Sequence, residues 1–247
     1  MTGVARSKAE YVAQRLLDRI VTQNLQPGSP LGTEAEILQQ FDVSRPTFRE
    51  SLRILEAQGV LELRPGPKGG IIVAMPGTDI LAHGLSVHLR MHDIPFVAVL
   101  RARSVMEPAL AAEAAEHGNS TEFEELQRCV ARMGRATSAE DFLDDCRSFH
   151  AQIAQASHNL VMTIFASTVS IIAAAEMSGI DLPAPVRSRF MAEYQAIVDA
   201  CRQRDSERAA RKMKDLVCEF ETMVQKRNQH NPERATMIVE REGRRLG

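Results

Sequence analysis

The chain has 247 residues, of which 44% are hydrophobic and 25% are charged, and its formal net charge is −2. This composition is that of a folded globular protein and excludes a disordered chain. The length allows two ordinary domains, and the aromatic content of only 4% favours helices packed by aliphatic side chains. With so small a net charge, any contact with nucleic acid has to come from a local basic face.

Neither a membrane span nor a disulfide framework is expected. The longest mixed apolar run, residues 160–175, is shorter than the roughly 20 residues that a membrane helix needs. The cysteines are widely spaced, form no C-x-x-C pair and follow no secretory leader. Reduced thiols in a cytoplasmic protein are therefore expected.

The first part of the chain predicts three helices. An amphipathic stripe predicts one helix over residues 7–24. Thr33 and Glu36 have the spacing of a capping box, so a second, short helix is expected to start there. Ser44 as N-cap and Pro46 in the first turn open a third helix.

A β-hairpin is predicted after this third helix. Its strands are residues 60–64 and 71–74, and a basic, glycine-rich tip joins them. Three helices and a hairpin within so short a segment predict a winged helix-turn-helix domain over residues 1–76.

Helical patterning alone continues over residues 77–228, and the breaks in it predict about seven helices. Their expected spans are 79–92, 95–117, 120–136, 139–157, 160–178, 184–204 and 206–228. The predicted fold class is therefore mainly α, with the winged helix-turn-helix followed by an all-helical bundle. Residues 229–247 have no clear apolar face and are expected to fray or to be disordered.

A row of arginines predicts a DNA-reading face on the third helix. Arg45, Arg49 and Arg53 are four residues apart and share one face, and arginine can present a bidentate fork to guanine or to phosphate. Such a row alone is more often a solvated face. Its combination with a capping box, a turn, a Pro-initiated helix and a basic hairpin in one domain favours the DNA reader.

Hydroxyl and hairpin residues extend this predicted interface. Ser44 and Thr47 lie at the helix N-terminus, where backbone N–H groups and the helix dipole favour phosphate. Arg64, Gly66 and Lys68 on the hairpin are placed to approach the adjacent groove or backbone.

The run LGTEAEILQQFDVSRPTFRESLRILEAQGVLELRPGPKGGIIV resembles the DNA-binding domain of the GntR family. This resemblance implies that Ser44, Arg45, Thr47 and Arg49 touch a DNA operator, assisted by the wing tip around 64–66. It also implies a transcription regulator, most often a repressor. A homodimer on an imperfectly palindromic operator is expected, because two-fold symmetry doubles what one recognition helix reads.

The second half resembles the FadR-type (FCD) effector domain of the same family, an antiparallel bundle that binds a small molecule and dimerises. The matching stretches are LRARSVMEP at 100–108, FHAQIAQASHN at 149–159 and EYQAI at 193–197.

Many domains of this type hold a divalent metal, but the ligand positions fall here on Cys146, His150, Tyr194 and Leu216. One imidazole among these groups does not make a transition-metal shell, so no metal or other cofactor is expected. The resemblance instead implies a metal-free pocket lined by these residues, in which Arg101 pairs with the carboxylate of a small organic acid. Tyr194 and Leu216 favour a longer or ring-bearing acid. Arg101 as a structural partner of Glu107 and His150 as a satisfied core histidine remain open alternatives.

The leading hypothesis is an effector-controlled DNA-binding regulator, not an enzyme. A ligand-independent dimeric DNA-binding protein is one alternative. A thiol enzyme using Cys146, His150 and Asp145 is another, although no oxyanion loop accompanies these residues.

Overall fold

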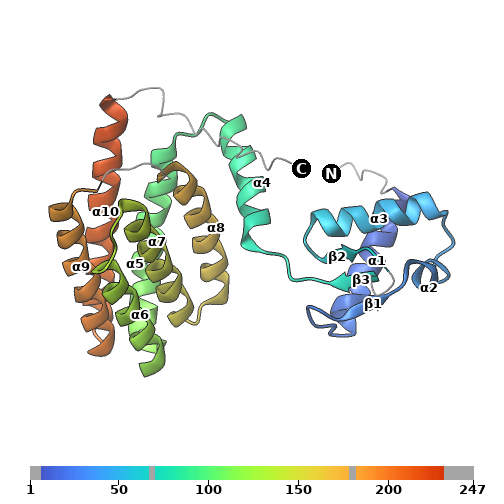
Figure 1. Cartoon of the computed structure of the whole chain (residues 1–247), viewed down its shortest axis with the longest axis horizontal. Coiled ribbons are helices and arrows are strands. Elements are labelled where there is room, and N and C mark those ends of the chain that lie inside the picture. Colours follow the sequence, from blue (N-terminus) through green and yellow to red (C-terminus); the bar gives the residue numbers. More distant parts are fainter. Residues whose placement is uncertain (1–6, 67–69, 178–181, 231–247) are drawn as a thin grey trace. The chain divides into compact units, whose positions relative to one another are not determined.

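The computed structural model describes residues 7–66, 70–177 and 182–230, and the chain forms two compact units that divide after Ile80 (Figure 1). This division falls slightly later than the expected end of the first domain at residue 76. Each unit has its own hydrophobic core.

Local capping starts each helix of the first unit, which contains α1 (Lys8–Thr22), α2 (Glu34–Leu38) and α3 (Arg45–Ala57). The predicted capping box is present before α2, because the Thr33 side chain accepts from the backbone N–H of Glu36 and the Glu36 carboxylate accepts from that of Thr33. These reciprocal bonds satisfy donors that the first helical turn leaves free.

The sheet of this unit has three antiparallel strands in the order β1-β3-β2. The predicted hairpin corresponds to β2 (Leu61–Arg64) and β3 (Gly70–Val73), which pair from Leu61↔Val73 to Arg64↔Gly70. The additional strand β1 (Pro30–Gly32) was not predicted. It has only three residues, and its Pro and Gly are both uncommon in β-strands. An edge position in the sheet tolerates both.

A glycine ends α3 at the turn into the hairpin. Gly59 has φ +71°, and a Cβ at this position would collide with the side chain of Ile80. Glycine adopts this left-handed conformation more easily than other residues. It allows the chain to turn sharply between α3 and β2.

All seven helices predicted after the hairpin are present. Their bounds are α4 (Thr78–Met91), α5 (Phe96–His117), α6 (Ser120–Met133), α7 (Ala139–Ala156), α8 (Leu160–Met177), α9 (Ala184–Arg202) and α10 (Ser206–His230). The last helix continues past the expected end at residue 228. The rest of the expected tail, 231–247, lies outside the described residues.

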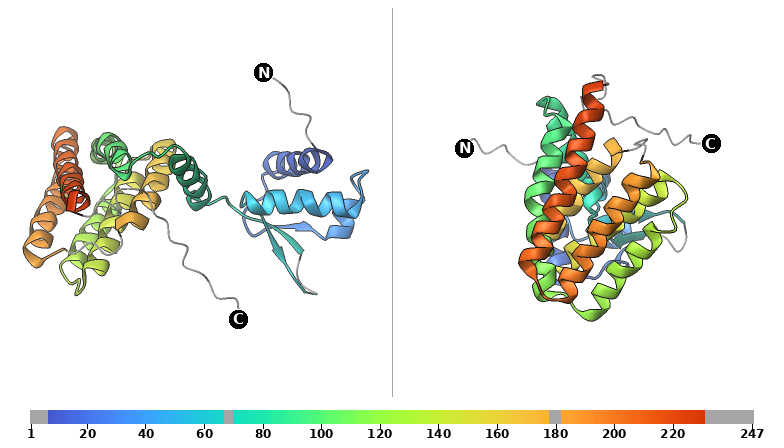
Figure 2. Two further views of the ribbon diagram at one scale, coloured as in Figure 1. Left: turned by 90° about the horizontal axis from the view of Figure 1, so that it is seen from above. Right: turned by 90° about the vertical axis from the view of Figure 1, so that its left-hand side faces the viewer.

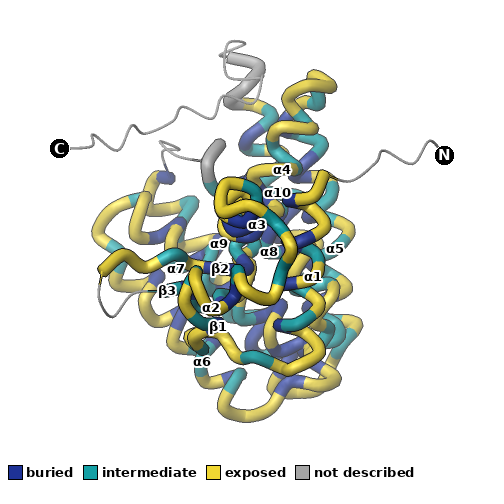
Figure 3. Tube along the Cα trace, turned by 90° about the vertical axis from the view of Figure 1, so that its right-hand side faces the viewer, coloured by how far each residue is buried: buried dark blue, intermediate teal, exposed yellow. Residues whose placement is uncertain are grey.

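The long helix α5 is the centre of this bundle. It packs against α7, α8, α9 and α10, and the right-hand view of Figure 2 shows α10 (red) running alongside α5 (green). Leu110, Ala111 and Ala114 on α5 have almost no exposed surface, and the buried positions continue along the neighbouring helices (Figure 3). Within the described part of the chain, no helix combines the length and apolarity that a bilayer crossing requires.

Candidate nucleic-acid interface and ligand site

The N-terminus of α3 presents a polar, exposed group of side chains. Ser44 caps the helix by accepting from the backbone N–H of Thr47, and the two hydroxyl oxygens are 2.8 Å apart. Arg45 follows at the first helical position, is exposed, and has no acidic partner within the described part of the chain. These groups are available to a phosphate or a base edge.

The other arginines predicted to contact DNA are held by carboxylates. Arg49 donates from Nε to both carboxylate oxygens of Glu34 on α2, at 3.0 and 3.2 Å. Arg64 on β2 donates to Glu62 at 3.1 and 2.9 Å. Both guanidinium groups therefore have a carboxylate partner within the DNA-binding unit.

A groove of about 310 Å³ lies between α3 and the hairpin. Arg49, Arg53 and Arg64 line it together with Glu34, so the recognition helix and the hairpin bring three guanidinium groups to one groove. Glu34 was not predicted as part of this interface. Its position in the first turn of α2, just before the recognition helix, could have indicated it. Gly66 is exposed with φ +105° at the wing, and Lys68 lies outside the described residues.

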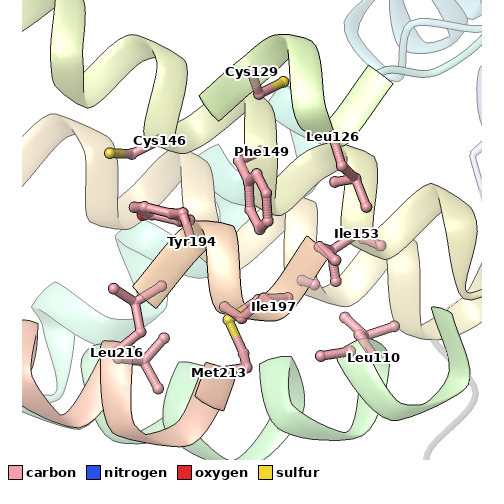
Figure 4. Close-up of a cluster of buried hydrophobic side chains, with 14 of the residues drawn as sticks. Leu110, Leu126, Cys129, Cys146, Phe149, Ile153, Tyr194, Ile197, Met213 and Leu216 are labelled. Carbon is pink, nitrogen blue, oxygen red and sulfur yellow. The ribbon is translucent and has the colours of Figure 1, made fainter. Parts of the chain in front are cut away.

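Two small adjoining cavities lie inside the helical unit. Each has a volume of about 30 Å³, and Arg103, His150, Tyr194 and Phe220 line both. Cys146 lines one and Leu216 the other. Four of the residues predicted for the pocket therefore do converge, from α7, α9 and α10; Figure 4 shows Tyr194 between Cys146 and Leu216.

A buried ion pair forms the charged wall of these cavities. Nε of Arg103 lies 2.6 Å from Glu107 Oε1, and the side chains are 10% and 5% exposed. Burial alone would raise the pKa of Glu107, but the attraction of Arg103 and His150 outweighs it and lowers that pKa to about 2. Both members of the pair are therefore charged at neutral pH.

His150 connects this ion pair to the aromatic side of the cavities. Its Nδ1 lies 2.9 Å from Glu107 Oε2, and its Nε2 lies 3.0 Å from the Tyr194 hydroxyl. The Nδ1 contact is close but poorly aligned, so neither atom has a hydrogen bond with good geometry. Phe149 packs edge-on against Tyr194 and holds the ring in place.

The prediction that Arg101 lines this pocket is wrong, because the structure places its side chain elsewhere. Its side chain is 70% exposed and pairs with Glu221 at 3.5 Å. Arg103, two residues along, is the arginine that lines the cavities, because two residues turn an α-helix by about 200° and so reverse the face. Glu107, considered as a partner of Arg101, pairs with Arg103 instead.

The expected room for a longer or ring-bearing acid is absent from these cavities. A water molecule needs about 10 to 15 Å³ of such space, so each cavity matches about two waters. Phe142, Phe190 and Phe220 are bulky side chains in the lining of the first cavity and limit its volume.

The cavity thiol is poorly suited to nucleophilic chemistry. Burial raises the pKa of Cys146 to about 12, and the thiolate is the reactive form of cysteine. Burial also raises the pKa of Tyr194 well above its usual value. The described residues contain no group of three His, Cys, Asp or Glu side chains arranged to hold a metal ion.

A winged helix-turn-helix with a basic recognition helix, followed in the same chain by a helical bundle, defines a DNA-binding transcription regulator. Comparison with known proteins gives the family. Residues 8–72 match the model of the bacterial regulatory proteins of the gntR family, and residues 98–218 match the FCD domain.

Similar proteins span most of the chain. An Escherichia coli (strain K12) protein named as a regulatory protein of the L-lactate dehydrogenase operon is 30% identical over 226 residues, covering 86% of this chain and 84% of that relative. The HTH-type transcriptional repressor NanR of Cronobacter sakazakii is 28% identical over 218 residues, covering 84% and 82%. The solved structure of Streptococcus agalactiae GntR shares the fold, with a TM-score of 0.67 and 22% identity over 87% of this chain and 99% of that one. The chain belongs to the GntR family, in the FCD-containing FadR subfamily.

Proposed function

We propose that this protein is a homodimeric, cytoplasmic repressor whose affinity for an imperfectly palindromic operator is controlled by a small organic acid. The acid occupies the cavities between α5, α7, α9 and α10 without a metal ion. One observation carries the proposal: the buried guanidinium of Arg103 lines both cavities of the helical bundle. The same chain carries the DNA-binding domain. A guanidinium is the side chain best suited to a carboxylate.

A second copy of the chain is proposed to bind the outer face of α8. Leu160, Val161, Ile164, Phe165 and Ile171 are exposed there, Phe165 to 57%, while α8 packs on α5 and α7. Residues 160–175 contain no charged side chain. A charge-free face can meet its own copy across a two-fold axis without like-charge repulsion.

The proposed operator contacts come from Ser44, Arg45, Thr47 and Arg49 on α3, with Arg53 and Arg64 along the groove. Lys68 and Gly66 at the wing are proposed to follow the backbone. Organic acid in the bundle would change the distance between the two DNA-binding units of the dimer and so change operator affinity.

The test starts from full-length protein and a pool of random-sequence DNA duplexes, from which a bound sequence is selected. Gel-shift titration of that sequence is then repeated with acetate, propionate or lactate. We expect a two-fold related site, and a carboxylate-dependent change in affinity that Arg103→Lys removes and the exposed-site variant Arg101→Ala retains. Binding without sequence preference, or an operator affinity that no carboxylate changes, would contradict the proposal.

A further inference from the structure

Arg103 and Glu107 balance each other's charge in the cavities before any ligand enters. Arg103 supplies one positive charge and Glu107 one negative charge at 2.6 Å, and both side chains are buried. Cys146 and Tyr194 remain neutral because burial raises the pKa of each. A carboxylate that entered unaccompanied would therefore add an uncompensated negative charge to a buried site, which is strongly unfavourable.

His150 is placed to take up a compensating proton. Its side chain is 9% exposed, and Nδ1 faces the second carboxylate oxygen of Glu107 at 2.9 Å without a satisfactory hydrogen bond. On the other edge of the ring, Nε2 meets a hydroxyl group that can either donate or accept. A proton on this imidazole would turn the poorly satisfied contact into a charge-assisted one.

We propose that the cavities take a monocarboxylate together with one proton held by His150, and that Glu107 sets this charge limit. The inference rests on the proposed binding of an organic acid at this site. With the ligand bound, Arg103 and protonated His150 balance Glu107 and the ligand carboxylate. A dicarboxylate brings a second negative charge for which the lining has no unpaired counter-charge, because Arg147 is already paired with Asp144, so it is excluded.

The groups around His150 account for this balance. Helix α5 supplies Arg103 and Glu107, and α9 supplies Tyr194. The residues of α10 that line the cavities are apolar: Leu216, Val217 and Phe220. On α7 itself the neighbours are Cys146 and Arg147; the Arg147 guanidinium is paired with Asp144. Among the described residues, α6 and α8 also pack on α7 but contribute no side chain to either cavity.

Calorimetric titration of the full-length dimer tests the proposal, with acetate, propionate and lactate as monoanion probes and malonate and succinate as dianion probes. Titrations between about pH 6 and about pH 8.5 bracket the range in which histidine changes charge. Repeating each in HEPES and in Tris, whose heats of ionisation differ, gives the number of protons taken up. Far-ultraviolet circular dichroism of each variant checks folding.

We expect monoanions to bind with uptake of up to one proton, and their affinity to fall by up to about tenfold per pH unit as pH rises. Dianions bind at least about tenfold more weakly, the equivalent of about 1.4 kcal/mol. His150→Gln removes the proton uptake and the pH dependence. Glu107→Gln also removes the proton requirement and lets malonate bind as well as propionate, whereas Arg101→Ala behaves as the parent protein.

Monoanion binding without proton uptake, or an unchanged pH dependence in His150→Gln, would overturn this inference while leaving acid binding at the site intact. Equal affinity for dianions in the parent protein would overturn it too. If no probe binds at any pH, the proposed effector function fails and the inference fails with it. If Glu107→Gln does not fold, the proton count in His150→Gln still decides the matter.

Discussion

Replacing Arg103 with alanine is expected to lower the free energy of unfolding of the helical unit by about 3 to 5 kcal/mol at neutral pH, the usual cost of breaking a buried pair by removing one partner. The structure gives a similar figure by a separate route. The pKa of Glu107 is lowered from 4.5 to about 2. At about 1.4 kcal/mol per pH unit, this lowering, which is net of the cost of burial, corresponds to about 3 kcal/mol of stability for the ionised carboxylate.

Arg101→Ala is the matched control for this substitution. It removes the same side chain from the same helix, but at a site that is 70% exposed and 3.5 Å from its acid. An exposed pair of this kind contributes about 0 to 1 kcal/mol. Urea unfolding followed by circular dichroism, at one fixed dimer concentration, measures both variants. Equal losses for the two variants would refute the burial argument.

The pH dependence of stability gives the same prediction a second test. Because the folded-state pKa of Glu107 is below its unfolded value, its stabilisation is fully present above about pH 5 and is lost as pH falls toward about 2. In Arg103→Ala the isolated carboxylate protonates more readily, so the deficit relative to the parent protein shrinks as the medium is acidified. The double variant Arg103→Met with Glu107→Gln leaves no buried charge and should recover much of the loss at neutral pH. A deficit that stays constant from pH 7 to pH 4 would count against the charge-based explanation.

Three further substitutions, one of them with a matched control, test other parts of the structure. Gly59→Ala should destabilise the DNA-binding unit by about 1 to 2 kcal/mol in thermal melting, since its φ is +71°. The matched control Gly84→Ala, in an open position on α4, should be neutral or stabilise the protein by up to about 1 kcal/mol. Arg45→Ala should weaken operator binding by about 1 to 3 kcal/mol in gel-shift titration at fixed salt, and an unchanged titration would show that α3 is not the reader. Phe165→Glu should convert the dimer to a monomer in size exclusion with light scattering; a persisting dimer would mean that another face joins the subunits.

The DNA reader could be predicted from sequence because its determinants are local. The second helix starts with hydrogen bonds between Thr33 and Glu36, which are only three residues apart. The third starts with the Ser44 cap and with Pro46, whose ring fixes φ at a helical value. Strand β1 escaped prediction because its identity depends on pairing with β3, some 40 residues away. Three residues with no alternation carry no signal of their own for that pairing.

The arginine of the helical unit was misassigned for a related reason. Arg101 and Arg103 are both plausible in sequence, and the apolar pattern of α5 is nearly continuous, so it does not show which face is more buried. One local signal was available, since Glu107 is four residues after Arg103 and therefore on the same face. What decides the matter is packing from α7 and α9, and the contact between His150 and Tyr194 joins positions 44 residues apart.

The volume of the cavities could not be predicted from the identity of their lining residues, because it depends on how closely the helices pack. Replacing potential metal ligands with Tyr194 and Leu216 suggested an enlarged apolar pocket, but helices in a bundle approach until their side chains fill the space between them. Here the tyrosine turns its hydroxyl to His150, and Phe190 and Phe220 close the remaining gap. Two cavities of about 30 Å³ beside a buried ion pair restrict any ligand to a small one. The selection by charge that we propose, through Glu107 and a proton on His150, would act in addition to this restriction on size.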